Sequence, residues 1–283
     1  MIDLDYLVIG HITCDMVQGG FAIGGTASFA ARTARAMGRR TGIITSVSPD
    51  LDLGQVLDDV LISRHSAATT TTFQNINTPG GRRQVLYEAA DRLVPAMIPP
   101  EWRIDPVEGV VHLGPVAQEC DVALLDGFDD VFIGLTPQGW MRCWDQDGYV
   151  SRCEWEGAEP LLSRAGAVVL SDEDLGGERD LAARYAAQTQ LLVVTHGAAG
   201  CTVYTKGGSR DFPAPGVHEV DATGSGDIFA TAYFVWLRHS ADPWAAAQFA
   251  NCVAAQSVRR EGLSGAPTPD EVAHCKRMVT SSA

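Results

Sequence analysis

Several features that would point to common protein classes are missing from this sequence of 283 residues. Positive charge is scarce, because 21 Lys and Arg stand against 35 Asp and Glu and give a formal net charge of −14. A surface this acidic repels nucleic acids and anionic lipids, so neither is an expected partner. The longest apolar run, residues 228–237, is also far shorter than the roughly 20 residues that cross a bilayer, so no membrane association is expected.

An N-terminal leader and closely spaced cysteine pairs are missing too. The first residues, MIDLDYLVIG, contain Asp3 and Asp5 but no cluster of cations, so they predict a strand and not a signal peptide. The cysteines are odd in number, none form a C-x-x-C pair, and Cys201 and Cys252 lie in apolar surroundings. We therefore expect buried thiols in a reducing, cytoplasmic protein, and neither a disulfide framework nor a zinc site. The full set is Cys14, Cys120, Cys143, Cys153, Cys201, Cys252 and Cys275.

The sequence also lacks the motifs of several nucleotide-dependent and hydrolytic enzymes. No Gly-Lys dipeptide occurs, which excludes a Walker A loop. The pair Gly224-x-Gly226 is followed by Asp227, Ile228 and Phe229, so it does not complete a dinucleotide-binding turn. Neither the G-x-S-x-G elbow of serine hydrolases nor the H-R-D and D-F-G motifs of protein kinases are found.

What the chain does contain is an alternation of short apolar strands with helical patterns. Residues 6–10 and 41–47 predict strands, and residues 26–38 and 53–63 predict helices. This β-α-β-α order is typical of a parallel sheet with helices on its faces. The pattern continues with expected strands at 109–115, 165–171 and 191–197 and expected helices at 178–189 and within 226–260.

Two hairpins interrupt this alternation. The Thr-rich segment 68–77 and the Pro79-Gly80-Gly81 turn predict an antiparallel flap that stands off the main sheet, and residues 200–215 predict a second hairpin. Three tryptophans, Trp140, Trp144 and Trp155, surround an acidic loop that we interpret as a connection between strands. Because no repeat and no linker divides the chain, residues 1–283 are expected to form one domain.

The segment that carries chemistry is a Gly-rich turn, Thr223-Gly224-Ser225-Gly226, followed by a long apolar helix. Glycines let the backbone approach a ligand closely, and the first amides of a helix lack intrahelical partners and lie at its positive end. The turn therefore predicts an anion site that needs no Lys or Arg. The adjacent Asp227 can accept a proton, which together suits phosphoryl transfer to an alcohol. The alternative is a tight turn in which Asp227 only caps the helix.

The wider string D-A-T-G-S-G-D-I-F, from Asp221 to Phe229, resembles the D-T-x-G-A-G-D-x-F signature of the ribokinase-like (PfkB) carbohydrate kinase family. Further segments resemble family segments in the same order along the chain. They are V-I-G-x-x-x-x-D ending at Asp15, Gly24-Gly25 with the Ala-rich helix after it, T-x-G-x-x-G at 195–200 and FANCVAAQSV at 249–258.

The resemblance implies a three-layer α/β/α core with a mostly parallel sheet, and a small β-sheet lid formed by about residues 11–23 and 68–90. It implies an ATP-dependent kinase that transfers the γ-phosphoryl group to a hydroxyl of a small sugar, a cyclitol such as inositol, or a nucleoside. Mg²⁺ would accompany ATP. Some members of the family bind K⁺ at the place that corresponds to Asp221 and the 258–266 loop, and some form a homodimer by pairing their lids.

The same resemblance assigns residues. Asp227 would be the general base, and the backbone amides of Gly224, Ser225, Gly226 and Asp227 would form the anion hole. The acceptor would be held by Asp15, Gly24 and Gly25, since a carboxylate can accept from two neighbouring hydroxyls. The nucleotide site would consist of Thr195, Gly197, Gly200, Thr223 and Asn251.

The sequence departs from the family pattern at two places. Phe29 stands where the family has an Asn that binds substrate, so it belongs either to the core or to an apolar face of the acceptor site. Residues 171–174, Ser-Asp-Glu-Asp, replace the family's N-x-x-E and leave Asp174 as the candidate Mg²⁺ residue. These changes keep open a non-catalytic sugar- or nucleotide-binding protein of the same fold.

Overall fold

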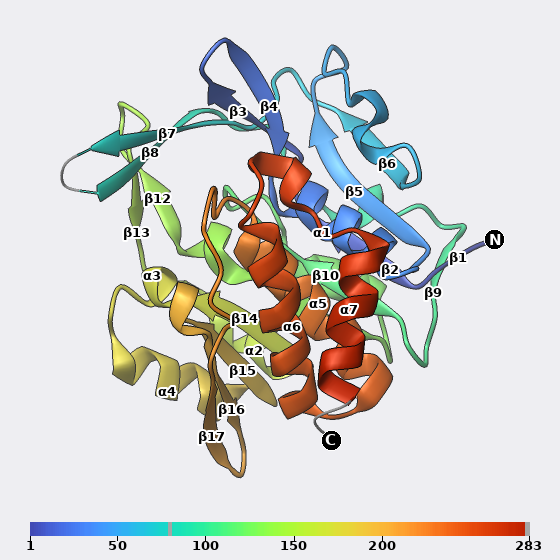
Figure 1. Ribbon diagram of the computed structural model, residues 1–283. Coiled ribbons are helices and arrows are strands. Elements are labelled where there is room, and N and C mark those ends of the chain that lie inside the picture. Colours follow the sequence, from blue (N-terminus) through green and yellow to red (C-terminus); the bar gives the residue numbers. More distant parts are fainter. Residues whose placement is uncertain (79–80, 281–283) are drawn as a thin grey trace.

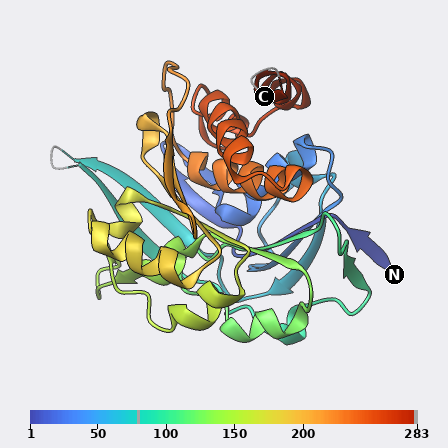
Figure 2. The same ribbon diagram turned by 90° about the horizontal axis from the view of Figure 1, so that it is seen from below.

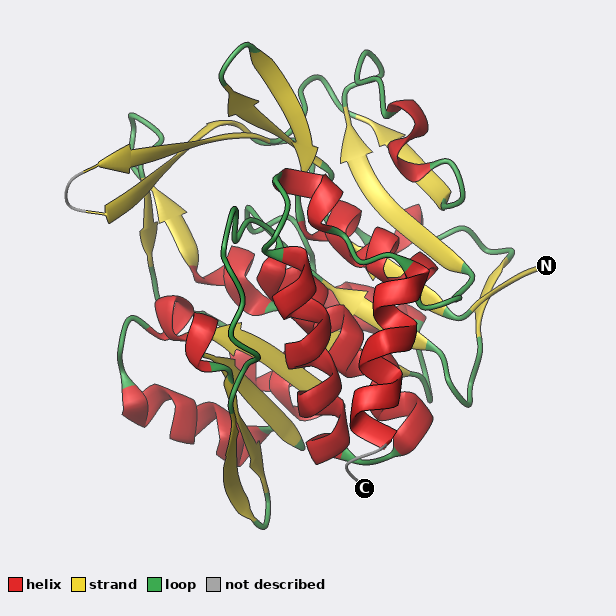
Figure 3. Cartoon of the chain, viewed as in Figure 1, coloured by secondary structure: helices red, strands yellow, loops and turns green. Residues whose placement is uncertain are grey.

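The computed structural model describes residues 1–78 and 81–280, so Pro79 and Gly80 of the expected flap turn lie outside the described residues. Within the described part, the main sheet has nine strands (Figures 1 and 3). These strands are β2 (Tyr6–Ile9), β5 (Thr41–Val47), β6 (Leu61–Ser66), β10 (Val110–Leu113), β11 (Phe132–Leu135), β14 (Ala167–Ser171), β15 (Leu191–Thr195), β16 (Cys201–Thr205) and β17 (Gly208–Phe212).

The strand order is β17-β16-β15-β14-β11-β10-β2-β5-β6. All neighbours from β15 to β6 are parallel, and only the hairpin β16–β17 adds antiparallel pairs. β2 is a continuous apolar run and β10 is interrupted only by His112, and every residue of both strands is buried because helices cover both faces of the sheet. The mostly parallel α/β sheet expected from the sequence is confirmed.

Helices lie on both sides of this sheet, as the second view makes plain (Figure 2). Alternate side chains of β2 join different cores: Tyr6 and Val8 pack with α1 and α5, whereas Leu7 and Ile9 pack with α2 and α4. This alternation follows from the two-residue period of a strand. The helices are α1 (Thr26–Ala36), α5 (Ser225–Ser240), α6 (Pro243–Ser257) and α7 (Pro269–Thr280) on one side, and α2 (Ala158–Arg164), α3 (Asp172–Leu175) and α4 (Arg179–Gln188) on the other.

A separate sheet stands beside the core at the position expected for a lid (Figure 1). It is formed by β3 (Thr13–Val17), β4 (Gly20–Gly24), β7 (Thr72–Thr78) and β8 (Gly81–Glu88), in the order β4-β3-β7-β8. The small hairpin β12 (Arg142–Trp144) and β13 (Val150–Arg152) supports its last strand, because the Leu86 amide donates to the Gly148 carbonyl at 2.8 Å. A further short pair joins β1 (Ile2–Leu4) to β9 (Trp102–Ile104).

Two expectations are wrong. Residues 53–63 are not a helix: a short 3₁₀ turn at Gly54–Leu57 leads into the edge strand β6, which pairs with β5 along its whole length. The local pattern is compatible with either element, and the free edge of β5 decides it.

The second correction concerns cysteine. The structure contains two disulfides, Cys143–Cys153 and Cys252–Cys275, with Cα atoms 5.8 and 5.7 Å apart. Cys252 is therefore not a thiol, whereas Cys201 is a free buried one, as expected. Sequence spacing does not show these pairs, because the first depends on the β12–β13 register and the second on the packing of α6 against α7. Within residues 1–78 and 81–280, no helix is both long and apolar enough to span a bilayer.

Candidate active site

The Gly-rich turn leads into α5 and places Asp227 in the first turn of that helix. Gly224 caps the helix with a φ of 77°, and a Cβ there would lie 2.3 Å from the Phe29 ring. Both the left-handed backbone and the contact require glycine at this position. Gly226 differs, because a Cβ there would have no atom within 4 Å and would face open space.

The backbone amides of the turn are not equivalent. The Ser225 amide donates to the Ala222 carbonyl at 3.1 Å, so it closes the turn. The amides of Gly226 and Asp227 belong to the first turn of α5, where N–H groups have no partner within a helix. Of the amides expected in the anion hole, those of Gly226 and Asp227 are therefore the best placed to meet a ligand.

The Asp227 carboxylate is held from the start of α1. Thr26 Oγ1 donates to Asp227 Oδ1 at 2.7 Å. Burial raises the pKa of Asp227 to about 6, while the Thr26 hydrogen bond and the positive charge of Arg142 act in the opposite direction. The carboxylates of Asp174 and Asp15 add to the rise. A carboxyl with this pKa is ionised at neutral pH and suits a general base.

A buried chain of hydrogen bonds fixes the helix that carries Asp227. Thr136 Oγ1 meets His112 Nε2 at 2.8 Å, and His112 Nδ1 meets the Tyr6 hydroxyl at 2.7 Å. Tyr6 then contacts Thr231 Oγ1 at 3.0 Å, and Thr231 donates to the Asp227 carbonyl at 2.9 Å. Burial lowers the pKa of His112 to about 3, so the ring is neutral. The chain ties β10 and β2 to the first turns of α5.

The two glycines before α1 bring Asp15 to the same place. A Cβ on Gly24 would lie 2.4 Å from Asp15 Oδ2, and a Cβ on Gly25, whose φ is 83°, would lie 2.4 Å from the His11 carbonyl oxygen. Thr13 Oγ1 also donates to Asp15 Oδ1 at 3.3 Å. Because the next residue, Thr26, binds Asp227, these contacts place both carboxylates at one end of α1.

Phe29 has a structural position. Its side chain is 2% exposed and belongs to the core on the α1 and α5 side of the sheet. The ring lies directly beneath Gly224, so it supports the turn from inside. Of the two interpretations that the sequence leaves open for Phe29, the structure favours the core.

Four of the expected nucleotide residues lie around the end of β15 and the β16–β17 hairpin. Thr195 ends β15, Gly197 is exposed, and a Cβ on Gly200 would lie 2.0 Å from the Phe212 carbonyl. Asn251 is 4% exposed, and its amide donates to that carbonyl at 3.0 Å. Asn251 therefore joins α6 to the end of β17.

His196, inside this segment, belongs to a polar row. Its Nδ1 meets Asp172 Oδ2 at 2.6 Å, and its Nε2 meets Thr202 Oγ1 at 2.8 Å. Thr202 in turn donates to Asp211 Oδ1 at 2.6 Å. The row connects the start of α3 with the β16–β17 hairpin.

The candidate metal residue Asp174 caps its own helix. Its Oδ2 accepts from the Ser171 amide and from Ser171 Oγ, both at 2.8 Å. In the described residues no group of three or more His, Cys, Asp or Glu could hold a metal ion. Mg²⁺ in phosphoryl-transfer sites commonly takes only one or two carboxylates, with phosphates and waters completing its shell. A single carboxylate, that of Asp174, therefore fits Mg²⁺ that arrives bound to the phosphates of the substrate that gives up its phosphoryl group.

Asp221 and Thr223 connect the turn with the chain after α6. Asp221 Oδ1 accepts from the Thr223 amide at 2.9 Å, and its Oδ2 accepts from the Gly262 amide at 2.7 Å. The Val220 amide also donates to the Val258 carbonyl at 2.7 Å. These hydrogen bonds hold the segment that is expected near K⁺ against the Gly-rich turn.

Two residues near Asp227 were missed by sequence reasoning, Thr26 and Arg142. Thr26 had a usable signal, since a hydroxyl directly after Gly24-Gly25 starts α1. Arg142 had none, because it lies in the segment interpreted as a connection. Its Nη1 donates to the Val116 carbonyl at 3.2 Å, and its guanidinium carbon lies 5.6 Å from the centre of the Phe73 ring.

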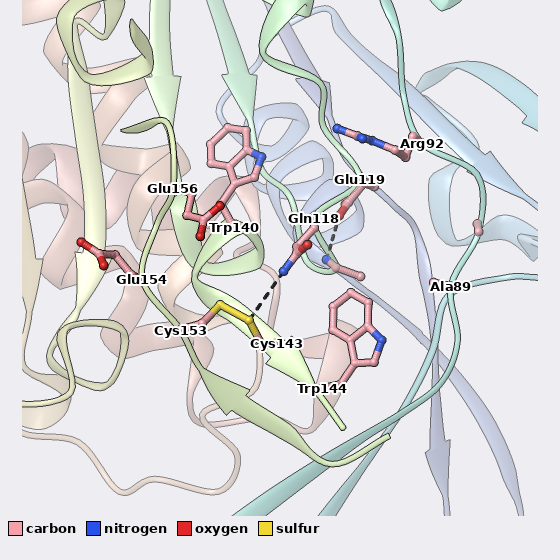
Figure 4. Close-up of a pocket in the computed structure, with 12 residues that line it drawn as sticks. Ala89, Arg92, Gln118, Glu119, Trp140, Cys143, Trp144, Cys153, Glu154 and Glu156 are labelled. Atoms are coloured by element: carbon pink, nitrogen blue, oxygen red, sulfur yellow. Dashed lines mark hydrogen bonds between the residues drawn. A yellow bond between two sulfur atoms is a disulfide. The ribbon is translucent and has the colours of Figure 1, made fainter. Parts of the chain in front are cut away.

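A separate cavity of about 650 Å³ is drawn in Figure 4. Its walls include Trp140, Trp144, Gln118 and the Cys143–Cys153 disulfide, whereas Asp15 and Asp227 do not line it. Gln118 Nε2 donates to the Arg142 carbonyl at 2.5 Å. The β12–β13 hairpin, which carries Arg142, therefore forms part of the cavity wall.

Comparison with known proteins finds similar kinases. The family model described as pfkB family carbohydrate kinase matches residues 162–271. An ATP-dependent ribose-1-phosphate kinase from Halopiger xanaduensis is 37% identical over 84 residues. That match covers 30% of this chain and 28% of the relative, so it spans little more than a quarter of the relative's length.

Solved structures extend the likeness over nearly the whole chain. A pyrophosphate-dependent kinase of the ribokinase family, complexed with a pyrophosphate analog and myo-inositol, has a TM-score of 0.78 at 22% identity, covering 95% of this chain and 99% of that one. Ribokinase from Thermotoga maritima has a TM-score of 0.72 at 18% identity, covering 97% and 99%. At these identities the likeness shows the fold.

The expected resemblance to the ribokinase-like (PfkB) carbohydrate kinase family and the expected fold are confirmed. The same comparisons agree with the expected enzyme class, a small-molecule kinase.

Proposed function

Starting from this ribokinase-like family resemblance, we propose that the chain is an ATP-dependent kinase that phosphorylates a hydroxyl of a small sugar, cyclitol or nucleoside. The observation that carries the proposal is the Asp227 carboxylate, held by Thr26 in the first turn of α5 and next to the amides of the Gly-rich turn. A helix cap alone would not require a partly buried carboxyl whose pKa rises to about 6.

The proposed reaction follows from these groups. Asp227 accepts the proton of the acceptor hydroxyl, whose oxygen forms a bond to the γ-phosphorus. The bond from that phosphorus to the bridging oxygen breaks, and ADP leaves with the electron pair. The amides of Gly226 and Asp227 stabilise negative charge on the transferred group, and Asp15 accepts hydrogen bonds from neighbouring acceptor hydroxyls.

The donor site is proposed at Thr195, Gly197, Gly200 and Thr223, with Asn251 holding the β17 end of that site in place. Mg²⁺ bound with the donor would neutralise phosphate charge, and Asp174 is the residue proposed to hold it. K⁺ near Asp221 and the 258–266 loop stays a proposal.

A homodimer through the lid and a cytoplasmic location also stay proposals. The lid edge β4 carries Phe21, which is 66% exposed. An exposed aromatic side chain on an unpaired strand edge is compatible with a second copy pairing there.

A release assay tests the proposed reaction. The purified chain is incubated with Mg²⁺ and a panel of sugars, cyclitols and nucleosides, with and without K⁺, and product formation is followed by ADP release. Inorganic pyrophosphate serves as a second donor with phosphate release as its signal, because a relative of the same fold uses it. Turnover of at least one hydroxyl acceptor supports the proposal. Ligand-dependent thermal shifts without turnover on the whole panel would instead support the non-catalytic sugar- or nucleotide-binding alternative.

The matched control is Asp227→Asn, which keeps the shape and an oxygen that can accept from Thr26. We expect turnover to fall roughly 10²–10⁴-fold, because the amide cannot take the proton. Burial raises the pKa of Asp227 from 3.8 in the unfolded chain to about 6 in the folded one, so its ionised form costs stability above pH 6, and that cost shrinks as the pH falls from about 6 towards 3.8. The variant should therefore melt at the same or a higher temperature than the wild type at pH 8. An Asn variant with near-wild-type turnover refutes the assignment of the base.

A further inference from the structure

Arg142 lies at the junction between the lid, the core and the catalytic carboxylate. On the lid side, its guanidinium covers Phe73 of β7, a side chain only 3% exposed. On the core side, its Nη1 donates to the carbonyl of Val116, just after β10. These contacts place the Arg142 side chain between the lid strand β7 and the loop after β10.

Four constraints fix this position. A Cβ on Gly139 would lie 2.3 Å from the Pro115 carbonyl carbon, so glycine lets the chain before β12 approach the loop after β10. Gln118, with a φ of 60°, donates to the Arg142 carbonyl at 2.5 Å. The Cys143–Cys153 disulfide and the β12–β13 register hold the next residue. A non-glycine residue with positive φ costs free energy, which is typical where a functional side chain must be positioned.

The same loop connects Arg142 to Asp227. A Cβ on Gly114 would lie 2.3 Å from Thr26 Cγ2, so the end of β10 packs against the residue that binds Asp227. Val116, which accepts from Arg142, follows two residues later. The positive charge of Arg142 also acts on the Asp227 carboxylate, so the guanidinium is within electrostatic reach of the group proposed to take the proton.

We propose that Arg142 binds anionic phosphate-type oxygens on the acceptor side of Asp227, opposite the amides of the Gly-rich turn. The proposal deepens the proposed kinase function and rests on it. Arg is suited to this role because its planar fork binds phosphate oxygens with fixed geometry. The oxygens come either from the phosphoryl group in transfer or from an anionic group that the acceptor itself carries.

A binding experiment tests this without turnover. Inorganic phosphate is titrated into the wild type, Arg142→Gln and the control Arg92→Gln by calorimetry. Arg92 lies in the same half of the molecule, is 68% exposed and pairs only loosely with Asp121, at 3.8 Å. We expect phosphate affinity to fall at least about tenfold in Arg142→Gln and to stay unchanged in Arg92→Gln. Equal affinity in all three proteins, or no phosphate binding by the wild type, overturns the proposal. Failure of the release assay leaves this readout intact, so the two ideas fail separately.

Kinetics then separate the two sources of the oxygens. If Arg142 contacts the phosphoryl group in transfer, Arg142→Gln lowers kcat roughly 10²–10³-fold with a neutral acceptor, the usual loss for one preorganised donor. If it contacts an anionic group of the acceptor, KM rises for a phosphorylated acceptor and stays unchanged for the neutral one. Arg142→Lys should recover part of either loss. Unchanged kinetics with both acceptor classes contradicts the proposal.

The pH profile separates this role from simple support of the lid. The charges of Asp15 of β3, Asp174 of α3 and Arg142 act on the Asp227 carboxyl, and the charge of Asp227 acts on the Tyr6 hydroxyl. Arg142 is the cation among them, and its charge holds the pKa of Asp227 down. Arg142→Gln should therefore move the acidic limb of kcat/KM to higher pH. A limb that stays in place while kcat falls shows that Arg142 acts only through packing and overturns the proposal.

Discussion

The proposed donor half and the proposed acceptor half of the site are built in different ways. The donor half comes from one stretch of chain, and the family model matches that stretch, residues 162–271. The acceptor half is assembled from segments far apart in the chain: the start of α1, the lid strands, the loop after β10 and the β12–β13 hairpin. The residues proposed for phosphoryl transfer therefore form a short string in the sequence, whereas the proposed acceptor surface exists only after folding.

Glycine has a different task in each half. In the Gly-rich turn, Gly224 makes room for the core residue Phe29. Before α1, Gly24 makes room for Asp15, a side chain proposed to bind substrate. A methyl group added at each position should therefore damage different properties, stability in the first case and acceptor binding in the second.

The largest effect is expected for Gly224→Ala. The methyl group would lie 2.3 Å from the Phe29 ring, at a residue with a φ of 77°. Strain at positive φ and overpacking each cost about 1–3 kcal/mol, so we expect a loss of roughly 2–5 kcal/mol in the free energy of unfolding. Denaturant unfolding measures this loss.

Gly226→Ala is the matched control for that prediction. Its methyl group would meet nothing within 4 Å, and alanine suits a helix better than glycine by about 0.5–1 kcal/mol. The variant should unfold like the wild type while losing turnover, because the open space beside Gly226 is where the phosphoryl group is proposed to lie. Equal destabilisation by both substitutions contradicts the distinction between the two glycines.

A smaller effect, confined to the acceptor half, is expected for Gly24→Ala. The added Cβ would lie 2.4 Å from Asp15 Oδ2, so the carboxylate must move, although as the end of a side chain it can do so without unfolding the protein. We expect the acceptor KM to rise about tenfold, equivalent to about 1.4 kcal/mol, while the donor KM and the melting temperature change little. Gly207→Ala, in the β16–β17 turn, should leave both constants unchanged. If the donor KM rises instead, Asp15 belongs to the donor half and the proposed acceptor role is wrong.

The same division explains how much the sequence could predict. Buried strands such as β2 and β10 and the long helix α5 depend on local hydrophobic patterns, and they were found. Asp227 could be singled out because the Gly-rich turn beside it is contiguous in sequence, and its role as the base stays a prediction, whereas its partners Thr26 and Arg142 are distant along the chain. Arg142 was missed because its contacts are distant in sequence. Val116 lies 26 residues before it, and Phe73 belongs to the lid strand β7. The strand at β6 was missed for a similar reason, since pairing with β5 decides it.

The smallest effect is expected at the contact that joins the halves, where Thr26 of α1 donates to Asp227 of α5. Burial raises the pKa of Asp227 to about 6, and the Thr26 hydrogen bond opposes that rise by stabilising the ionised form. Asp227 must be ionised to act as a base, so kcat/KM should fall as the pH drops below about 6.

Thr26→Val removes the hydrogen bond at nearly constant volume and leaves the ionised form less favoured. A hydrogen bond to a charged group is worth about 1.5 kcal/mol or more, so the acidic limb should move up by about one pH unit. Thr26→Ser keeps the hydroxyl and should keep the wild-type limb. If Thr26→Val leaves the limb in place or moves it to lower pH, the group that titrates is not Asp227, and the base must be sought elsewhere in the site.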